Sequence, residues 1–290
     1  MADDAVQLFG VGEEGPIRLR LPQPPSSLHS LPPELPVDVY TVFRTFDGSK
    51  FLGLAAHLDR LDQSLALLGR DYRVDRGRLR LALHQACSGY RSGNRRVRID
   101  VLRHPVEALG IPGRLLLTLA PFKPPPERCY EEGVRLRVAP RLQRARPRAK
   151  TADFIDARQA YPVSDHDAYE WLLLDDEHRI LEGTSSNFYA VRDGTLWTAG
   201  EHVLEGITRA IVLQLAPEIG IPLRLEAVPL SGLPHFQEAF LSSSSRGLMA
   251  VVQIEEQVVG DGEPGLVTRQ LMSAYERFVA HAVQPALYED

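Results

Sequence analysis

Lys150 and Glu182 are the two residues whose types and surroundings suggest covalent chemistry. The chain has 33 basic residues, of which three are lysines (Lys50, Lys123 and Lys150) and the rest arginines. Lys50 lies in a DGSK turn and Lys123 beside a proline run, where solvent would surround both, whereas Lys150 lies between a basic loop and a segment with apolar patterning. A lysine amine whose pKa is lowered by its surroundings is a nucleophile that forms Schiff bases with carbonyl compounds.

Pyridoxal phosphate (PLP) is such a carbonyl compound, and its site needs more than a lysine. It needs an acid beside the pyridine nitrogen, a cradle for the phosphate and walls that orient the ring. Glu182, in the run LEGTSSNFYAV, is a candidate for the acid, and the segments LEGITRAIVLQLA and EAFLSSSSRGLMAVVQI are candidates for the cradle. Taken alone, such a lysine and glutamate are more often a surface residue and a charge at a strand end.

Six segments in order resemble the class IV, or fold type IV, PLP-dependent aminotransferases over roughly residues 38 to 280. They are VYTVFRTFDG, HLDRLDQSLALLG, the lysine segment, LEGTSSNFYAV, LEGITRAIVLQLA, and EAFLSSSSRGLMAVVQI followed by GDGEPGLVTRQL. This family includes branched-chain and D-amino-acid aminotransferases, (R)-selective amine transaminases and aminodeoxychorismate lyases. The resemblance implies a two-domain α/β fold (of α+β type) like that of D-amino-acid aminotransferase, with the cofactor between the domains.

The resemblance also assigns the cofactor-binding residues. Lys150 is implied as the Schiff-base residue and general base, and Glu182 as the partner of the pyridine nitrogen. Leu204 is implied to cover one face of the ring. The phosphate contacts are implied to come from the arginine of the H-x-x-R-L motif, a helix start and the serine-rich turn: Arg60, Gly206, Ile207, Thr208 and Ser244. Free backbone N–H groups at a helix start form an anion site, although threonine there is also a common N-cap.

Five residues are implied as substrate contacts. Alternation in DVYTVFRT places Tyr40, Val42 and Arg44 on one face of a strand, and Ser245 and Arg246 end the serine-rich turn. An ordinary half-buried strand and a solvated arginine remain the alternatives.

Three departures from the family pattern leave the substrate open. Thr41 stands where many members carry a glutamate, and Ile155 stands where branched-chain enzymes carry a tyrosine that bonds the cofactor's phenolic oxygen. The loop HPVEALGIPG lacks the Arg-x-His pair with which D-amino-acid enzymes bind a carboxylate.

The candidate cofactor residues, in order along the chain, predict a homodimeric PLP-dependent transaminase: Arg60, Lys150, Glu182, Thr208 and Ser244. It would move an amino group from an amino acid or primary amine donor to a 2-oxo acid acceptor, through pyridoxamine phosphate. Two alternatives remain open, a PLP lyase of the aminodeoxychorismate type and a family member that binds PLP without catalysis. The homodimer is implied by the resemblance alone.

Periodicity places these residues on the elements of two domains. The proline run of residues 122–128 predicts a linker between a small N-terminal α/β domain, residues 1–121, and a larger C-terminal domain, residues 129–290, that carries Lys150. Leu58, Leu61 and Leu65 predict an amphipathic helix. Residues 153–161 are expected to be helical. The strand EWLLLDD is expected to pair with a second strand, RILEGTSSNFYAV. The asparagine of this second strand, Asn187, either organises the site or is structural.

Composition favours a cytoplasmic globular protein. Apolar residues make up 44% and charged residues 24% of the chain. A net charge of −5 argues against binding nucleic acid through phosphate neutralisation, so the basic run of residues 141–150 is interpreted as a solvated loop. Two cysteines cannot form a disulfide framework, and neither a signal peptide, a membrane-spanning run nor a metal site is predicted.

Overall fold

A computed structural model describes residues 5–21, 25–32, 35–89, 93–106, 110–111, 113–163 and 168–287. The chain divides into two compact units: unit 1 comprises residues 1–123, 149–155 and 281–290, and unit 2 comprises residues 124–148 and 156–280. The first boundary lies within residues 122–128. Residues 149–155, which include Lys150, group with unit 1, whereas the segments on either side of them, residues 124–148 and 156–280, form unit 2. The loop HPVEALGIPG lies partly outside the described residues.

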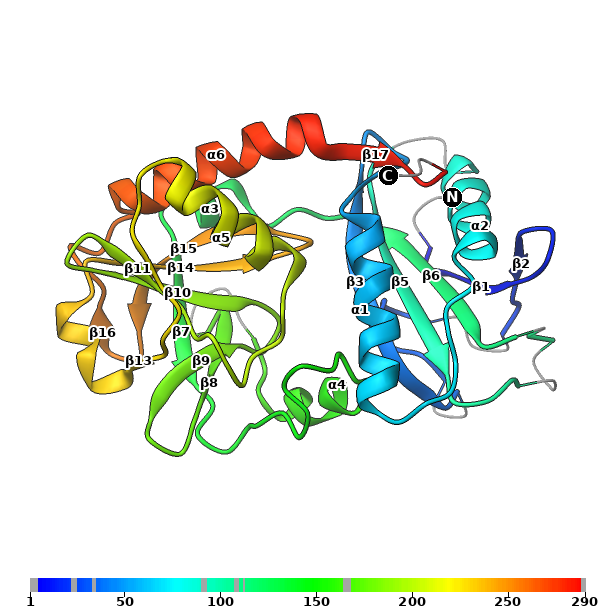
Figure 1. Cartoon of the computed structure of the whole chain (residues 1–290), viewed down its shortest axis with the longest axis horizontal. Coiled ribbons are helices and arrows are strands. Elements are labelled where there is room, and N and C mark those ends of the chain that lie inside the picture. The colour runs from blue at the N-terminus through cyan, green and yellow to red at the C-terminus, as the bar shows by residue number, and fades with distance from the viewer. Residues whose placement is uncertain are drawn as a thin grey trace. The chain divides into compact units, whose positions relative to one another are not determined.

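Unit 1 contains a seven-stranded antiparallel sheet in the order β17-β4-β3-β5-β6-β1-β2 (Figure 1). Its strands are β1 (Gln7–Val11), β2 (Pro16–Arg18), β3 (Val37–Phe46), β4 (Lys50–Leu52), β5 (Arg95–Leu102), β6 (Leu115–Pro121) and β17 (Val283–Pro285). Its helices are α1 (Leu54–Leu67) and α2 (Arg76–Ser88).

Helix α1 packs on one face of this sheet through the predicted leucine stripe. Leu58, Leu61 and Leu65 share one buried core with Val39 and Phe43 of β3. Because successive side chains of a strand point to opposite faces, the alternate residues of β3 are directed away from α1. The predicted helix and strand are both confirmed.

Unit 2 contains a ten-stranded sheet in the order β12-β11-β10-β14-β15-β7-β8-β9-β13, with β16 paired to β15. A further pairing of β9 with β10 closes β10, β14, β15, β7, β8 and β9 into a ring. The strands are β7 (Val134–Val138), β8 (Glu170–Leu174), β9 (Arg179–Gly183), β10 (Asn187–Arg192), β11 (Thr195–Trp197), β12 (Leu223–Arg224), β13 (Val228–Pro229), β14 (Glu238–Ser243), β15 (Gly247–Ile254) and β16 (Gln257–Val258).

The helices of this part of the chain are α3 (Glu127–Glu131), α5 (Ile207–Glu218) and the 3-10 helices η2 (Arg158–Ala160) and η3 (Leu230–His235). Two further helices, α4 (Asp153–Ala157) and α6 (Leu266–Ala282), cross the boundary between the units in the chain. The expected helix at residues 153–161 is therefore present as α4 followed by η2.

The prediction of one continuous strand RILEGTSSNFYAV was wrong, because the run turns at residues 184–186 between β9 and β10. The buried carboxylate of Glu170 holds this turn. Its Oε1 accepts hydrogen bonds from the backbone N–H of Ser185 at 2.5 Å and from the hydroxyl of Ser186 at 2.9 Å. A side chain at Gly183 would overlap Glu170 and Ser186, so glycine permits this close approach.

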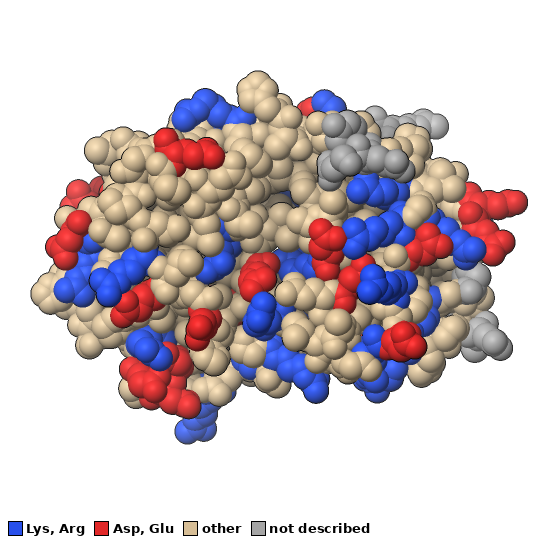
Figure 2. Space-filling model, viewed as in Figure 1, with Lys and Arg blue, Asp and Glu red and all other residues tan. Residues whose placement is uncertain are grey.

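Within the part of the chain that the structure describes, no helix is both long and apolar enough to cross a membrane. The same residues include no group of three or more His, Cys, Asp or Glu that could hold a metal ion. On the face drawn in Figure 2, acidic and basic side chains are interspersed.

Candidate active site

Lys150 lies in a short extended segment that joins the edge of the unit 1 sheet. Because β4 pairs only with the last residues of β3, the first half of β3 has an edge open to this segment. The N–H of Tyr40 donates to the carbonyl of Lys150 at 3.0 Å, and that of Ala152 to the carbonyl of Asp38 at 3.1 Å. The N–H of Lys150 donates to the Ser64 hydroxyl of α1 at 3.1 Å. This pairing explains why Lys150 groups with unit 1.

Tyr40, Val42 and Arg44 lie on the face of β3 that is directed away from α1. The Tyr40 ring is buried, with Lys150 Nζ at 5.0 Å and the Arg98 guanidinium at 4.7 Å from its centroid. Arg44 lies over the Phe122 ring at 4.7 Å. The structure therefore brings Tyr40 to Lys150 and places Arg44 against an aromatic ring, while their substrate contacts stay predictions.

Arg60 is a buried residue of α1 and not a solvated one. It is 6% exposed, and its Nη2 donates to the hydroxyl of Thr41 on β3 at 3.0 Å. His57, the histidine of the same H-x-x-R motif, is 1% exposed, and its Nδ1 lies 2.7 Å from the same hydroxyl oxygen. A buried guanidinium is costly unless it is hydrogen-bonded, so these contacts fix where the Arg60 charge lies.

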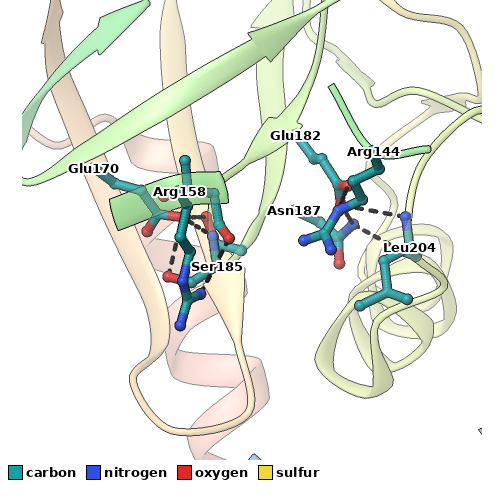
Figure 3. Close-up of polar contacts among 9 residues, drawn as sticks. Arg144, Arg158, Glu170, Glu182, Ser185, Asn187 and Leu204 are labelled. Carbon is teal, nitrogen blue, oxygen red and sulfur yellow. Dashed lines mark hydrogen bonds and ion pairs between the residues drawn. The ribbon is translucent and has the colours of Figure 1, made fainter. Parts of the chain in front are cut away.

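Glu182 of β9 is buried opposite Asn187 of β10, at the pairing that closes the strand ring (Figure 3). Its Oε1 lies 2.6 Å from Arg144 Nε. Its Oε2 accepts from the backbone N–H of Leu204 at 3.2 Å and from Asn187 Nδ2 at 3.4 Å. A cation and two further donors thus fix the position of the carboxylate.

Asn187 connects Glu182 to the start of α5. Its Nδ2 also donates to the carbonyl of Leu204 at 2.8 Å, and its Oδ1 occupies the space that a side chain at Gly206 would fill. Helix α5 begins at Ile207 after Gly206, the N-cap, which makes no side-chain capping bond.

Thr208 lies within the first turn of α5. Because the N-cap is Gly206, the interpretation of Thr208 as the cap does not apply. Its side chain is buried, and among the described residues its hydroxyl has no hydrogen-bond partner. A helix start with backbone donors, together with a buried hydroxyl of this kind, suits an anion.

The serine-rich turn between β14 and β15 contains Ser244 and Ser245, both half-buried, and ends at Arg246. Arg246 Nη2 lies 2.8 Å from Glu170 Oε2 and 2.9 Å from the Ser185 hydroxyl. A substrate carboxylate at Arg246 would have to compete with this ion pair.

The charges of the Glu170–Arg246 pair stabilise each other. Burial alone would raise the pKa of Glu170, but Arg246, the Ser185 N–H and the Ser186 hydroxyl together lower it. Burial would lower the pKa of Arg246, but the Glu170 carboxylate raises it. Both groups therefore stay charged although they are largely buried.

The sequence pattern does not single out Arg144. The basic run of residues 141–150 was interpreted as a solvated loop, yet the Arg144 side chain is only 5% exposed because it pairs with Glu182. Its neighbours Arg141, Arg146 and Arg148 are exposed, as expected. In a run of several arginines, the sequence alone does not reveal which arginine pairs with a buried carboxylate far along the chain.

Known relatives share both sequence and fold with this chain. It is 33% identical to the D-alanine aminotransferase of Staphylococcus aureus (strain COL) over 113 residues, which are 37% of this chain and 40% of that protein. The chain therefore matches about two fifths of the length of such relatives. It is 26% identical to the D-alanine aminotransferase of Bacillus licheniformis over 249 residues, 83% of this chain and 87% of that protein.

Solved structures have the same fold. A putative branched-chain amino acid aminotransferase from Thermotoga maritima gives a TM-score of 0.76 at 24% identity, over 95% of this chain and 96% of that one. The 4-amino-4-deoxychorismate lyase from Pseudomonas aeruginosa gives 0.68 at 26% identity, over 90% and 96%. The predicted α/β, fold type IV architecture is confirmed.

The family model described as amino-transferase class IV matches residues 38–254, well over half of the chain. This range includes every residue of the candidate site, from Tyr40 through Lys150 and Glu182 to Arg246. The chain belongs to the class IV aminotransferases, a family of PLP-dependent enzymes.

Proposed function

We propose that this protein is a transaminase that moves an amino group from an amino acid or primary amine to a 2-oxo acid, with PLP held covalently by Lys150. The observation that carries the proposal is the family match over residues 38–254, which contains the half-buried Lys150 and the salt-bridged Glu182 together. The activity and the site residues below are parts of this proposal.

The side chains fit three chemically distinct parts of PLP. The amine of Lys150 suits the aldehyde, and the buried carboxylate of Glu182 suits the pyridine nitrogen. The Thr208 hydroxyl is buried and has no partner among the described residues, as a ligand of an absent phosphate would be.

When bound, PLP supplies an electron sink for the carbanion that an amino acid forms on losing its α-proton. Once the substrate amine has displaced Lys150 from the cofactor, the freed Lys150 Nζ would take that proton as general base and deliver it to the C4′ carbon of the cofactor as general acid. Glu182 stabilises positive charge on the pyridine nitrogen by charge pairing. Arg144, the Leu204 N–H and Asn187 hold the Glu182 carboxylate in place.

The phosphate ligands come from three elements in this proposal. Arg60 of α1 provides a guanidinium, whose planar fork of donors matches phosphate oxygens. Gly206, Ile207 and Thr208 provide the helix start, and Ser244 a hydroxyl of the serine-rich turn. Leu204, buried beside Glu182, covers one face of the ring.

A PLP lyase of the aminodeoxychorismate type is the second candidate. It is favoured by the likeness to the Pseudomonas aeruginosa lyase at 26% identity over 90% of this chain. Lyase and transaminase differ in what happens to the substrate after proton removal, so the same lysine and glutamate serve both.

The visible absorption spectrum separates the two candidates. PLP-loaded protein is mixed with D-alanine, L-leucine, L-glutamate or (R)-1-phenylethylamine, one at a time and without an acceptor. A transaminase loses its cofactor band with at least one donor and regains it when a 2-oxo acid is added. A band that persists with every donor, together with release of pyruvate and 4-aminobenzoate from aminodeoxychorismate, would favour the lyase. Persistence with neither product would leave a protein that binds PLP without catalysis.

The homodimer and the cytoplasmic location stay predictions. Light scattering of the purified protein tests the first, since each chain has a mass of 32.3 kDa.

A further inference from the structure

A polar face of α1 lies beside its leucine stripe within unit 1. His57, Arg60 and Ser64 are buried and recur at spacings of three and four residues, so they share one side of the helix. Ser64 accepts the N–H of Lys150, and Arg60 and His57 meet at the hydroxyl of Thr41. Thr41 and His57 have no role in the proposed function.

Arg60, Thr41 and His57 form a hydrogen-bond relay that begins at the Arg60 guanidinium. Arginine is only a donor, so Arg60 Nη2 donates and Thr41 Oγ1 accepts at 3.0 Å. The Thr41 hydroxyl oxygen lies 2.7 Å from His57 Nδ1, so the hydroxyl can donate its proton to this nitrogen. Arg60 Nη2 also lies 3.5 Å from His57 Nδ1, and because arginine has only donors, this contact favours a neutral imidazole whose Nδ1 carries no proton.

The electrostatics of the site agree with a neutral imidazole. Complete burial, followed by the positive charges of Arg60 and Lys150, lowers the pKa of His57 well below its ordinary value. The ring is also packed against Phe43, with centroids 4.6 Å apart. His57 is therefore a fixed acceptor at the end of the relay and not a third cation beside Arg60 and Lys150.

The Thr41 hydroxyl can orient the Arg60 guanidinium without neutralising its positive charge. A carboxylate in place of the Thr41 hydroxyl would form an ion pair with Arg60. A hydroxyl fixes one guanidinium nitrogen and contributes no negative charge. Loss of that hydroxyl would leave the Nη2 donor of a buried arginine without this acceptor, and the guanidinium plane without this restraint.

We propose that Thr41 and His57 are positioning residues that hold the Arg60 guanidinium in the orientation in which it binds the phosphate of PLP. The inference rests on the proposed role of Arg60 as a phosphate ligand. It predicts that the two residues affect affinity for the phosphorylated cofactor and not for the rest of the molecule.

The test compares binding of PLP with binding of pyridoxal, which lacks the phosphate. The full-length chain is freed of cofactor and titrated with each compound. The Kd for pyridoxal divided by the Kd for PLP reports the contribution of the phosphate alone. Thr41→Val is expected to reduce this ratio about tenfold, the size of one lost hydrogen bond to a charged group. Thr41→Ser keeps the hydroxyl and is expected to keep the ratio.

Two further variants make the result decisive. His57→Phe keeps a ring against Phe43 but removes the acceptor, so it is expected to reduce the ratio as Thr41→Val does. Ser64→Ala, on the same helix face, removes the hydroxyl that accepts the N–H of Lys150. It is expected to weaken the binding of PLP and of pyridoxal by similar factors.

The outcomes distinguish the two levels of the argument. An unchanged ratio in folded Thr41→Val or folded His57→Phe, with a reduced ratio in Arg60→Ala, would overturn the relay and leave the role of Arg60 intact. An unchanged ratio in Arg60→Ala itself would remove the phosphate role of Arg60 and the relay with it.

Discussion

Two buried glutamates show how surroundings assign different roles to the same residue type. Glu170 pairs with Arg246 and holds a serine turn. Glu182 pairs with Arg144 and faces Asn187 (Figure 3). The contacts of Glu170 all tie parts of unit 2 to one another. We therefore expect Glu170 to contribute mainly to stability and Glu182 mainly to catalysis.

Glu182→Gln tests this assignment. The substitution keeps the shape of the side chain but removes its charge, so the pyridine nitrogen loses its counter-ion. We expect kcat/KM to fall by about 10²–10³-fold, typical of losing one electrostatic stabiliser. Glu170→Gln is the matched control, and leaving the Arg246 cation unpaired should lower the free energy of unfolding by about 3 kcal/mol. Activity of Glu182→Gln within tenfold of the unsubstituted protein would contradict the assignment.

His57 predicts how stability depends on pH. Unfolded His57 binds a proton as the pH falls below its ordinary pKa of 6.5, whereas burial and nearby cations keep folded His57 neutral. Lowering the pH therefore favours the unfolded state, and stability present above pH 6.5 is lost below it, by at most about 1.4 kcal/mol per pH unit. Urea denaturation of the unsubstituted protein and His57→Phe at several pH values measures this, and the variant should show a shallower decline. Equal slopes would show that folded His57 takes up the proton.

At the scale of elements, local patterns were good predictors and distant partners were not. The leucine stripe of α1 and the alternation of β3 can be predicted because each depends only on the helix or strand period. The joining of the Lys150 segment to β3 could not be predicted, since it depends on how little of β3 the short strand β4 covers. The turn between β9 and β10 was missed because a carboxylate on β8, Glu170, holds it.

The residues of the candidate site also divide into those that a local sequence pattern predicts and those that depend on distant partners. The lysine, the glutamate and the H-x-x-R arginine stand out by residue type and motif. Arg144, Thr41 and His57 do not, because their roles come from contacts of one side chain with another across the fold.

The junction between β10 and α5 gives a prediction at this scale. Gly206 has φ −70° and ψ 141°, which any residue adopts, so the cost of Gly206→Ala comes from overlap with Asn187 Oδ1. We expect this substitution to cost about 1–3 kcal/mol, as overpacking does. Asn187→Ala should cost about 1–2 kcal/mol, because the Leu204 carbonyl loses its donor.

A double-mutant cycle on the free energy of unfolding checks this junction. Removing the Asn187 side chain opens the space that the new methyl group needs. The double variant should therefore be less destabilised than the sum of the single ones by about 1 kcal/mol. Strict additivity would mean that the two positions do not interact.

On the scale of the whole molecule, both units contain residues of the proposed site. Arg60 belongs to unit 1, and so does Lys150, because the chain returns to unit 1 at residues 149–155. Glu182 and Thr208 belong to unit 2. The substrate is not predictable from residue types, since pocket shape decides specificity. The central claim, covalent attachment at Lys150, does not depend on the substrate.

The chain contains three lysines, so the attachment site can be identified directly. PLP-loaded protein is reduced with borohydride, digested and examined by mass spectrometry for the phosphopyridoxyl group. We predict that the group is found on Lys150, and that Lys150→Ala protein carries none. A phosphopyridoxyl group on Lys50 or Lys123, or its absence from Lys150 in protein that has bound PLP, would contradict the account.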